Sequence, residues 1–152
     1  MSSRLVLAVG NPYRGDDGIG PALLEVLRGY SDLADVDMLD GGTGGLELAL
    51  VLEGRDHVIV LDAADFAGEP GSWRRFTLEE LLPESGESLA TLHDAGVAHA
   101  IALSLALGQR PRKFSLYGIQ PACLEPVVGL SSEAKSAMLE VACVVRDELC
   151  SR

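Results

Sequence analysis

The sequence predicts an α/β fold in which helices cover both faces of a mostly parallel sheet. Short apolar runs alternate along the chain with segments whose apolar residues recur every three or four positions. Such alternation favours parallel strands, because each helix carries the chain back to begin the next strand in the same direction. The 152 residues are 47% hydrophobic and 23% charged, a balance typical of one globular domain with a sizeable core. We therefore expect a single domain over residues 1–152.

Apolar runs bounded by turn residues mark three strands in the first half of the chain. A spacing of three or four between the apolar residues marks the first helix, which contains Ile19, Leu23, Leu27 and Tyr30. The third strand is apolar over four successive residues, so both of its faces should be covered. The elements expected here are a strand at 5–9, a helix ending at Gly29, a strand at 36–39, a short helix at 46–52 and a strand at 57–61.

The second half of the chain predicts a weaker strand, a buried helix, a last strand and a long helix. Residues 72–77 contain Trp73 and Phe76 among polar residues, which favours an exposed strand at a sheet edge. Residues 95–107 are apolar nearly all round, as in a buried helix. A strand at 113–119 follows, and Ser132 is expected to cap the last helix.

Composition excludes several classes of protein. The net charge of −11 disfavours nucleic acid as a partner, whereas a basic or neutral protein partner is compatible with it. The three cysteines, Cys123, Cys143 and Cys150, are scattered and odd in number, which argues against a disulfide framework. The longest apolar stretch, 95–107, is too short to span a bilayer. We therefore expect a cytoplasmic protein without a membrane segment.

The loop after the first strand begins like a phosphate-binding loop and then becomes acidic. Gly10 and Gly15 have the G-x-x-x-x-G spacing of a P-loop, but Asp16 and Asp17 stand where Lys and Ser or Thr would follow. Two carboxylates repel phosphate and attract a cation or a proton. The loop therefore predicts a metal or acid site rather than a nucleotide site. A helix cap is the simpler interpretation of either acid.

Two acids and one histidine are expected to converge on a crevice. Right-handed crossovers place the second and third strands on opposite sides of the first, which makes the first and third neighbours at a topological switch point. Asp17 follows the first strand and Asp62 ends the third. His93 precedes the buried helix. Two carboxylates and one imidazole leave coordination positions open, as in a catalytic metal site rather than a closed structural one.

Other polar residues have simpler interpretations. Asp62 could stabilise a loop, and Asp65 is a plausible loop acid. We expect His57 to lie on the surface and His99 to be a packed core or rim histidine. Cys123 has no evident activating base, so we do not expect it to be the nucleophile.

The glycine-rich loop at 40–45 ends the second strand. Its ordinary interpretation is a tight turn that needs positive φ. Its exposed backbone beside the crevice could also pair with an extended peptide. We therefore predict that Gly41, Gly42 and Thr43 contact substrate.

Together these residues resemble the hydrogenase maturation endopeptidases, which trim the C-terminus of the nickel–iron hydrogenase large subunit. The resemblance runs from residue 5 to about residue 131. It implies a three-layer α/β/α sandwich around a five-stranded sheet with one antiparallel strand, for which residues 72–77 are suited. The matching segments, in family order, are Gly10-Asn11, Gly15-Asp16-Asp17-Gly18-Ile19-Gly20, Asp40-Gly41-Gly42-Thr43, Asp62-Ala63, His93, Gly118-Ile119-Gln120-Pro121 and Gly129-Leu130-Ser131.

The resemblance also implies roles for particular residues. Asp17, Asp62 and His93 match the metal-binding residues of the family, and Asp40 matches an acid implicated in the reaction or in substrate handling. Asp17, Asp62 and Asp40 are thus the expected catalytic residues of an aspartic-type endopeptidase. The metal is expected to be nickel already inserted in the large-subunit precursor, with zinc or cadmium as possible substitutes in vitro.

The sequence leaves the chemistry of cleavage open. Metal polarisation of the carbonyl, a metal-activated water, or Asp17 or Asp62 as general base are all compatible with it. The H-E-x-x-H motif of ordinary zinc proteases is absent from the sequence. One alternative function is a non-catalytic checkpoint or chaperone of nickel-enzyme assembly. Another is a small nucleotide-binding domain, which Asp16 and Asp17 disfavour.

Overall fold

One five-stranded sheet organises the protein in a computed structural model that describes residues 2–81 and 95–151. The strands lie in the order β2-β1-β3-β5-β4. The first four of these run parallel, and β4 pairs with β5 in the antiparallel direction. This confirms the mostly parallel sheet with one antiparallel strand. The strands are β1 (Arg4–Ala8), β2 (Asp37–Asp40), β3 (His57–Ala63), β4 (Trp73–Phe76) and β5 (Lys113–Ile119).

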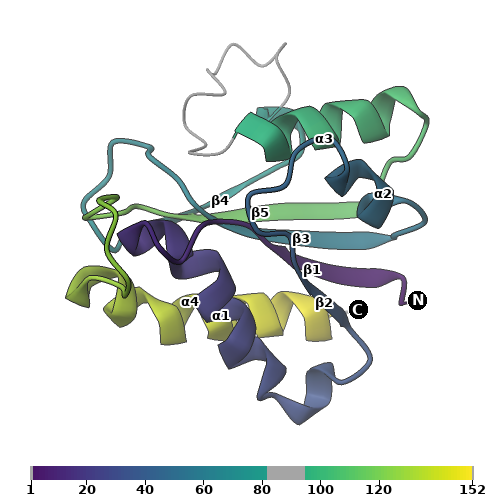
Figure 1. The fold of residues 1–152 in the computed structure, drawn as a ribbon. Helices are drawn as coiled ribbons and strands as arrows, with labels where there is room; N and C mark the ends of the chain where they lie inside the picture. The colour runs from purple at the N-terminus through teal and green to yellow at the C-terminus, as the bar shows by residue number, and fades with distance from the viewer. Residues whose placement is uncertain (1, 82–94, 152) are drawn as a thin grey trace.

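Helices cover both faces of the sheet and complete the expected three layers. Figure 1 shows α1 and α4 below the sheet and α2 and α3 above it. Short 3-10 turns precede α1, follow it and follow β4. The α-helices are α1 (Ile19–Arg28), α2 (Leu48–Leu52), α3 (Ala95–Ala106) and α4 (Ser132–Cys150), and the turns are η1 (Gly15–Gly18), η2 (Ser31–Leu33) and η3 (Glu79–Leu81).

The apolar core is divided by the sheet into two clusters. Successive strand residues point to opposite faces, so Val6 packs with α1 and α4 whereas Leu5 packs with α2 and α3. β3 lies between β1 and β5 and is buried at all seven positions. This confirms the expectation that both faces of the third strand are covered, and it fixes the sheet as a rigid support for its loops.

Element boundaries agree closely with the predictions, with two informative differences. The last strand spans the predicted residues, and the predicted strand at 72–77 is the edge strand β4. β3 continues to Ala63, which places Asp62 inside the strand. The cap of α4 is Ser131 rather than Ser132, because the hydroxyl of Ser131 accepts the Ala134 N–H at 3.1 Å.

No helix within the described residues is both long and apolar enough to cross a membrane. The predicted buried helix at 95–107 corresponds to α3, which ends at Ala106.

Candidate functional site

The register of the sheet brings the ends of three parallel strands together. Ala8, the last residue of β1, lies opposite Asp40 of β2 on one side and opposite Leu61 of β3 on the other. Beyond Ala8, the Val9 N–H donates to the Leu61 carbonyl at 3.0 Å. Asp40 and Asp62 therefore flank the end of β1 at the same edge of the sheet, as the predicted switch point requires.

The acidic loop folds back onto this edge through two close backbone approaches. A side chain at Gly10 would place its Cβ 1.9 Å from the Asp17 carbonyl oxygen, and one at Gly20 would lie 2.5 Å from the Val9 oxygen. The Asp17 carboxylate accepts the Asn11 N–H at 2.8 Å. Asp17 thus lies against the ends of β1 and β3. It is 4% exposed and Asp62 is fully buried.

Asp16 has other hydrogen-bond partners than Asp17 and a different role. Its carboxylate accepts hydrogen bonds from the backbone N–H groups of Ala122 (2.8 Å), Cys123 (3.3 Å) and Ser131 (2.7 Å), and from the Ser131 hydroxyl (2.7 Å). Burial favours the neutral acid, but the hydrogen bonds from Ser131, Ala122 and Cys123 prevail and lower the pKa of Asp16. Asp16 therefore fastens the 121–131 loop to the β1 loop as a carboxylate.

The simple interpretation of the two acids as helix caps is wrong. The N-cap of α1 is Gly18, and no side chain caps it. Asp16 acts on another helix instead, because the Ser131 hydroxyl that donates to Asp16 also caps α4. No local pattern in the sequence indicates these bonds, because the partners lie 106 to 115 residues away along the chain.

The glycine-rich loop makes the tight turn expected of it. The Asp40 carboxylate, which is exposed, accepts the Gly42 N–H at 2.8 Å, and Gly42 has φ of +57°. The Gly41 N–H donates to Ala8, and the Gly42 carbonyl accepts the Gly10 N–H. Thr43 is exposed at the tip. The loop is thus fixed to β1 on the same edge as Asp17 and Asp62.

His93, the predicted third ligand, lies outside the described residues, within the segment 82–94. In the described parts of the chain, no three His, Cys, Asp or Glu side chains gather as a metal site. The donor set of Asp17 and Asp62 consists of carboxylate oxygens only, so a nitrogen ligand would have to come from elsewhere. The assignment of His93 stays a prediction.

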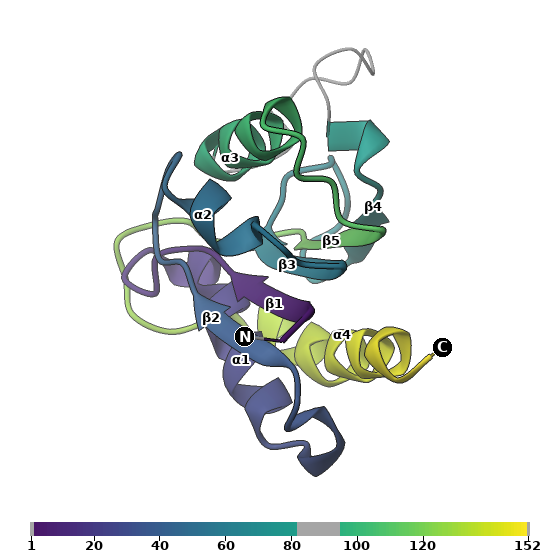
Figure 2. The same ribbon diagram turned by 90° about the vertical axis from the view of Figure 1, so that its right-hand side faces the viewer.

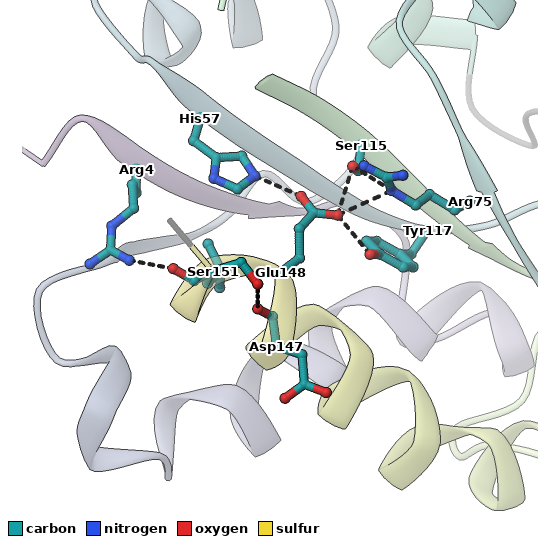
Figure 3. A network of polar contacts seen from close by, with 9 residues as sticks. Arg4, His57, Arg75, Ser115, Tyr117, Asp147, Glu148 and Ser151 are labelled. Atoms are coloured by element: carbon teal, nitrogen blue, oxygen red, sulfur yellow. Dashed lines mark hydrogen bonds and ion pairs between the residues drawn. The ribbon is translucent and has the colours of Figure 1, made fainter. Parts of the chain in front are cut away.

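His57 is buried, which corrects the expectation of a surface residue. It is 6% exposed, and its Nε2 lies 2.6 Å from a carboxylate oxygen of Glu148 on α4. Figure 3 shows His57, Arg75, Ser115 and Tyr117 directed at this one carboxylate. The hydroxyls of Tyr117 and Ser115 donate to it at 2.7 and 2.8 Å. This network lies at the start of β3, away from the strand ends that carry Asp62.

Glu148 is a buried acid that no sequence motif marks. Burial would raise the pKa of Glu148, but hydrogen bonds from His57, Tyr117 and Ser115 and the nearby Arg75 charge lower it to about 2. Conversely, burial and the bond to Glu148 raise the pKa of Tyr117. The network therefore joins a carboxylate and a neutral phenol, and it anchors α4 to the sheet.

The remaining candidates are structural or exposed. Asp65 accepts hydrogen bonds from Ala67 and from the Gln120 side chain, consistent with a loop acid. His99 is exposed on α3, which corrects the expectation of a packed histidine. Cys123 is half-buried, and its carbonyl accepts the Asp16 N–H at 2.8 Å.

Comparison with known proteins decides the family. A family profile described as hydrogenase maturation protease matches residues 21–148. The chain belongs to the hydrogenase maturation protease family. This maturation protease is 36% identical to the hydrogenase 2 maturation protease of Escherichia coli over 140 residues, which are 91% of this chain and 84% of that protein. It is 34% identical to the hydrogenase expression/formation protein HupM of Azotobacter chroococcum, over 93% of this chain and 68% of that protein.

Solved structures agree on the fold of this maturation protease. The hydrogenase maturating endopeptidase HybD from E. coli superposes with a TM-score of 0.76 at 29% identity, covering 95% of this chain and 93% of that one. The solution structure of an endopeptidase from Escherichia coli gives a TM-score of 0.83 at 32% identity, covering 93% and 89%. The α/β/α arrangement and the family expected from the sequence are both confirmed.

Proposed function

We propose that this maturation protease removes the C-terminal extension of a nickel-loaded large-subunit precursor of a nickel–iron hydrogenase. The observation that carries the proposal is that two buried acids, Asp17 and Asp62, lie beside the neighbouring ends of β1 and β3. Two carboxylates placed near one another attract a cation or share a proton. A cation brought by the substrate would be attracted to these carboxylates during the reaction.

The proposed nickel ligands are Asp17, Asp62 and His93. Carboxylates and an imidazole form a mixed oxygen and nitrogen set that suits a borderline divalent ion such as Ni²⁺. Three protein ligands leave positions for donors from the precursor, so the ion would be held best when the substrate carries it. Zinc or cadmium could replace it in vitro. Binding through the metal would fix the scissile peptide close to the acids, and proximity of this kind supplies much of a rate.

Peptide hydrolysis then requires a base for the attacking water and an acid for the leaving amine. Either Asp17 or Asp62 can take a proton from the water while the water oxygen attacks the carbonyl carbon. The same acid can then return the proton to the amide nitrogen as the C–N bond breaks. Asp40 lies at the same edge but is exposed, with one oxygen bonded to Gly42. We therefore assign Asp40 to handling of the substrate at the mouth of the site.

The loop after β2 offers one residue for pairing with an extended peptide. The N–H and carbonyl groups of Gly41 are bonded to Ala8 and Gly44, and those of Gly42 to Asp40 and Gly10. Within the described residues, the backbone of Thr43 has no such partner. In the proposed complex, Gly41 and Gly42 shape the turn and Thr43 contacts the precursor chain.

The test compares two precursors that differ only in nickel loading. The protease is stripped with a chelator, the chelator is removed, and the mass of each precursor is followed over time. We expect the nickel-loaded precursor to be shortened at its C-terminus and the empty one to remain intact. Asp17→Asn and Asp62→Asn should each lower the rate by about a hundredfold or more, an effect typical of losing an acid or base. Asp65→Asn, an exposed acid three residues from Asp62, is the matched control.

Three outcomes would contradict parts of the proposal. Equal cutting of both precursors would show that the protease does not use nickel to recognise its substrate. A requirement for zinc bound beforehand to the protease would indicate a conventional metalloprotease. Nickel-dependent binding without any cutting would favour the non-catalytic checkpoint.

A further inference from the structure

Three exposed leucines border one hollow on the α2 and α3 face. Leu46, Leu50 and Leu107 are 56%, 73% and 66% exposed. All three line a hollow of about 500 Å³, together with Leu103 and Ala49. Figure 2 shows α2 beside α3 on this face of the sheet. We name the surface formed by these five residues the leucine groove.

The packing of the core does not account for the exposed leucines of the groove. Leu48 and Leu52 on the inner side of α2 pack on the sheet, so the core is already filled by one face of this helix. A surface helix normally presents polar residues outward, whereas α2 presents Leu50. Large exposed apolar side chains that share one hollow mark interaction sites on soluble proteins.

The charges around the leucine groove indicate which kind of partner it can bind. Glu47 and Glu53 stand at the two ends of α2 and line the same hollow. Among the described residues that line it, none is Lys or Arg. The protein as a whole carries a net charge of −11. A partner segment that is apolar in its centre and basic at its flanks would therefore bury the leucines and meet both carboxylates. A second copy of this chain fits poorly, because a symmetric contact would bring the same acids together.

The leucine groove lies next in the chain to the sheet edge that carries Asp40 and Asp62. Leu46 directly follows Gly45, the last residue of the loop that carries Thr43. We propose that the leucine groove binds an apolar, basically flanked segment of the large-subunit precursor, outside the cleaved bond. This inference rests on the proposed function, and it makes the groove a recognition surface of that same site. The groove holds the precursor while the strand ends act on its C-terminus.

The test places a charge in the groove and a matched charge on the opposite face. Leu50→Asp and Leu107→Asp change the groove, and Leu139→Asp changes an equally exposed leucine on α4, at 68% exposure. Binding of nickel-loaded precursor to immobilised protease is measured by interferometry, and KM and kcat by mass spectrometry. Each groove variant should raise Kd and KM by about tenfold or more and leave kcat unchanged, as expected for an apolar anchor. Leu139→Asp should stay within about twofold of the unaltered protein.

Charge reversal checks the second half of the proposal. Glu47→Lys combined with Glu53→Lys should weaken precursor binding at low salt and reduce its dependence on salt. Melting curves of all variants confirm that they fold, which exposed positions should permit.

The outcomes separate this inference from the proposed function. If the groove variants bind and process the precursor normally, the docking surface is wrong and the protease function stands. If the groove variants lose binding but the unaltered protein never cuts, the function is wrong and the docking surface stands. If sedimentation shows that Leu50→Asp splits a dimer without changing precursor binding, the groove joins two copies and the proposal is overturned.

Discussion

Asp16 holds its buried carboxylate among four donors from the 121–131 loop, and Asp17 directs the next carboxylate toward the strand ends. The two residues are adjacent, of the same type and nearly equally buried. Their surroundings alone distinguish an acid that holds a loop from an acid proposed to act on substrate. Residue type and spacing therefore identify the pair, whereas long-range contacts assign the roles.

Replacing Asp16 with Ala should destabilise the protein strongly. The change removes charge-assisted hydrogen bonds and leaves the backbone N–H groups of Ala122 and Ser131 without their acceptor. We expect the free energy of unfolding to fall by about 3 kcal/mol. Urea denaturation measures this change in the free energy of unfolding. Asp35→Asn, which breaks the ion pair of an exposed acid with Arg4, is the control and should cost less than about 1 kcal/mol. A loss for Asp16→Ala as small as that of the control would refute the fastening role.

Glu148 should make stability depend on acid pH. Its pKa is about 2 in the folded protein and near 4.5 in the unfolded chain, so between these values the unfolded chain binds more protons. The stabilisation is complete above about pH 5 and is lost as the pH falls toward 2. We expect Glu148→Gln to lower the free energy of unfolding by about 3 kcal/mol at pH 7. Its difference from the unaltered protein should shrink by pH 3.

The control for this prediction is another carboxylate on the same helix. Glu140 is exposed on α4, so Glu140→Gln should leave the pH dependence nearly unchanged. Thermal melts across pH 3 to 7 provide the comparison. A difference between Glu148→Gln and the unaltered protein that stays constant over this range would show that packing, rather than ionisation, causes the loss.

At the scale of elements, the approach of α1 to the sheet depends on Gly20. A Cβ at this position would lie 2.5 Å from the Val9 oxygen and 2.6 Å from the Leu61 oxygen. Gly20→Ala should gain up to about 1 kcal/mol of helix propensity but lose more through the clash. We expect a net loss of about 2 kcal/mol in urea denaturation, because backbone atoms must move.

Gly29, at the other end of α1, provides the comparison for Gly20. A Cβ there would come no closer than 3.2 Å to the Val26 oxygen, and its φ is −76°. Gly29→Ala should therefore be nearly neutral. Equal losses of stability for Gly20→Ala and Gly29→Ala would mean that the close approach of α1 to β1 and β3 does not require glycine at position 20.

Elements dominated by local pattern were predictable from the sequence. The strand at 113–119 is apolar over its second half and bounded by polar residues, and it was located to the residue. Edge strand β4 is predictable because Trp73 and Phe76, residues favoured in strands, stand among polar neighbours. The predicted cap of α4 is one residue too late, since Ser131 and Ser132 are chemically alike and only contacts in the folded chain, to Ala134 and Asp16, distinguish them.

At the scale of the molecule, the sequence predicts those parts of the candidate site that the strand order alone brings together. Parallel strands end at the same edge of a sheet, so the strand order alone places Asp62 beside the loop after β1. His57 was misread because its partner, Glu148, lies 91 residues away on α4. Pairings of that kind depend on the complete packing of the chain and leave no pattern near either residue.

The two edges of the sheet bear on the behaviour of the protein at high concentration. The outer strands, β2 and β4, are four residues long, and their charged residues have opposite signs: Asp37 and Asp40 on one, Arg74 and Arg75 on the other. Short, charged edges are poor templates for adding a strand from another molecule. The open sides of this sheet therefore resist growth into fibrils. A protein that must expose an apolar groove to a partner thus keeps its aggregation-prone edges small.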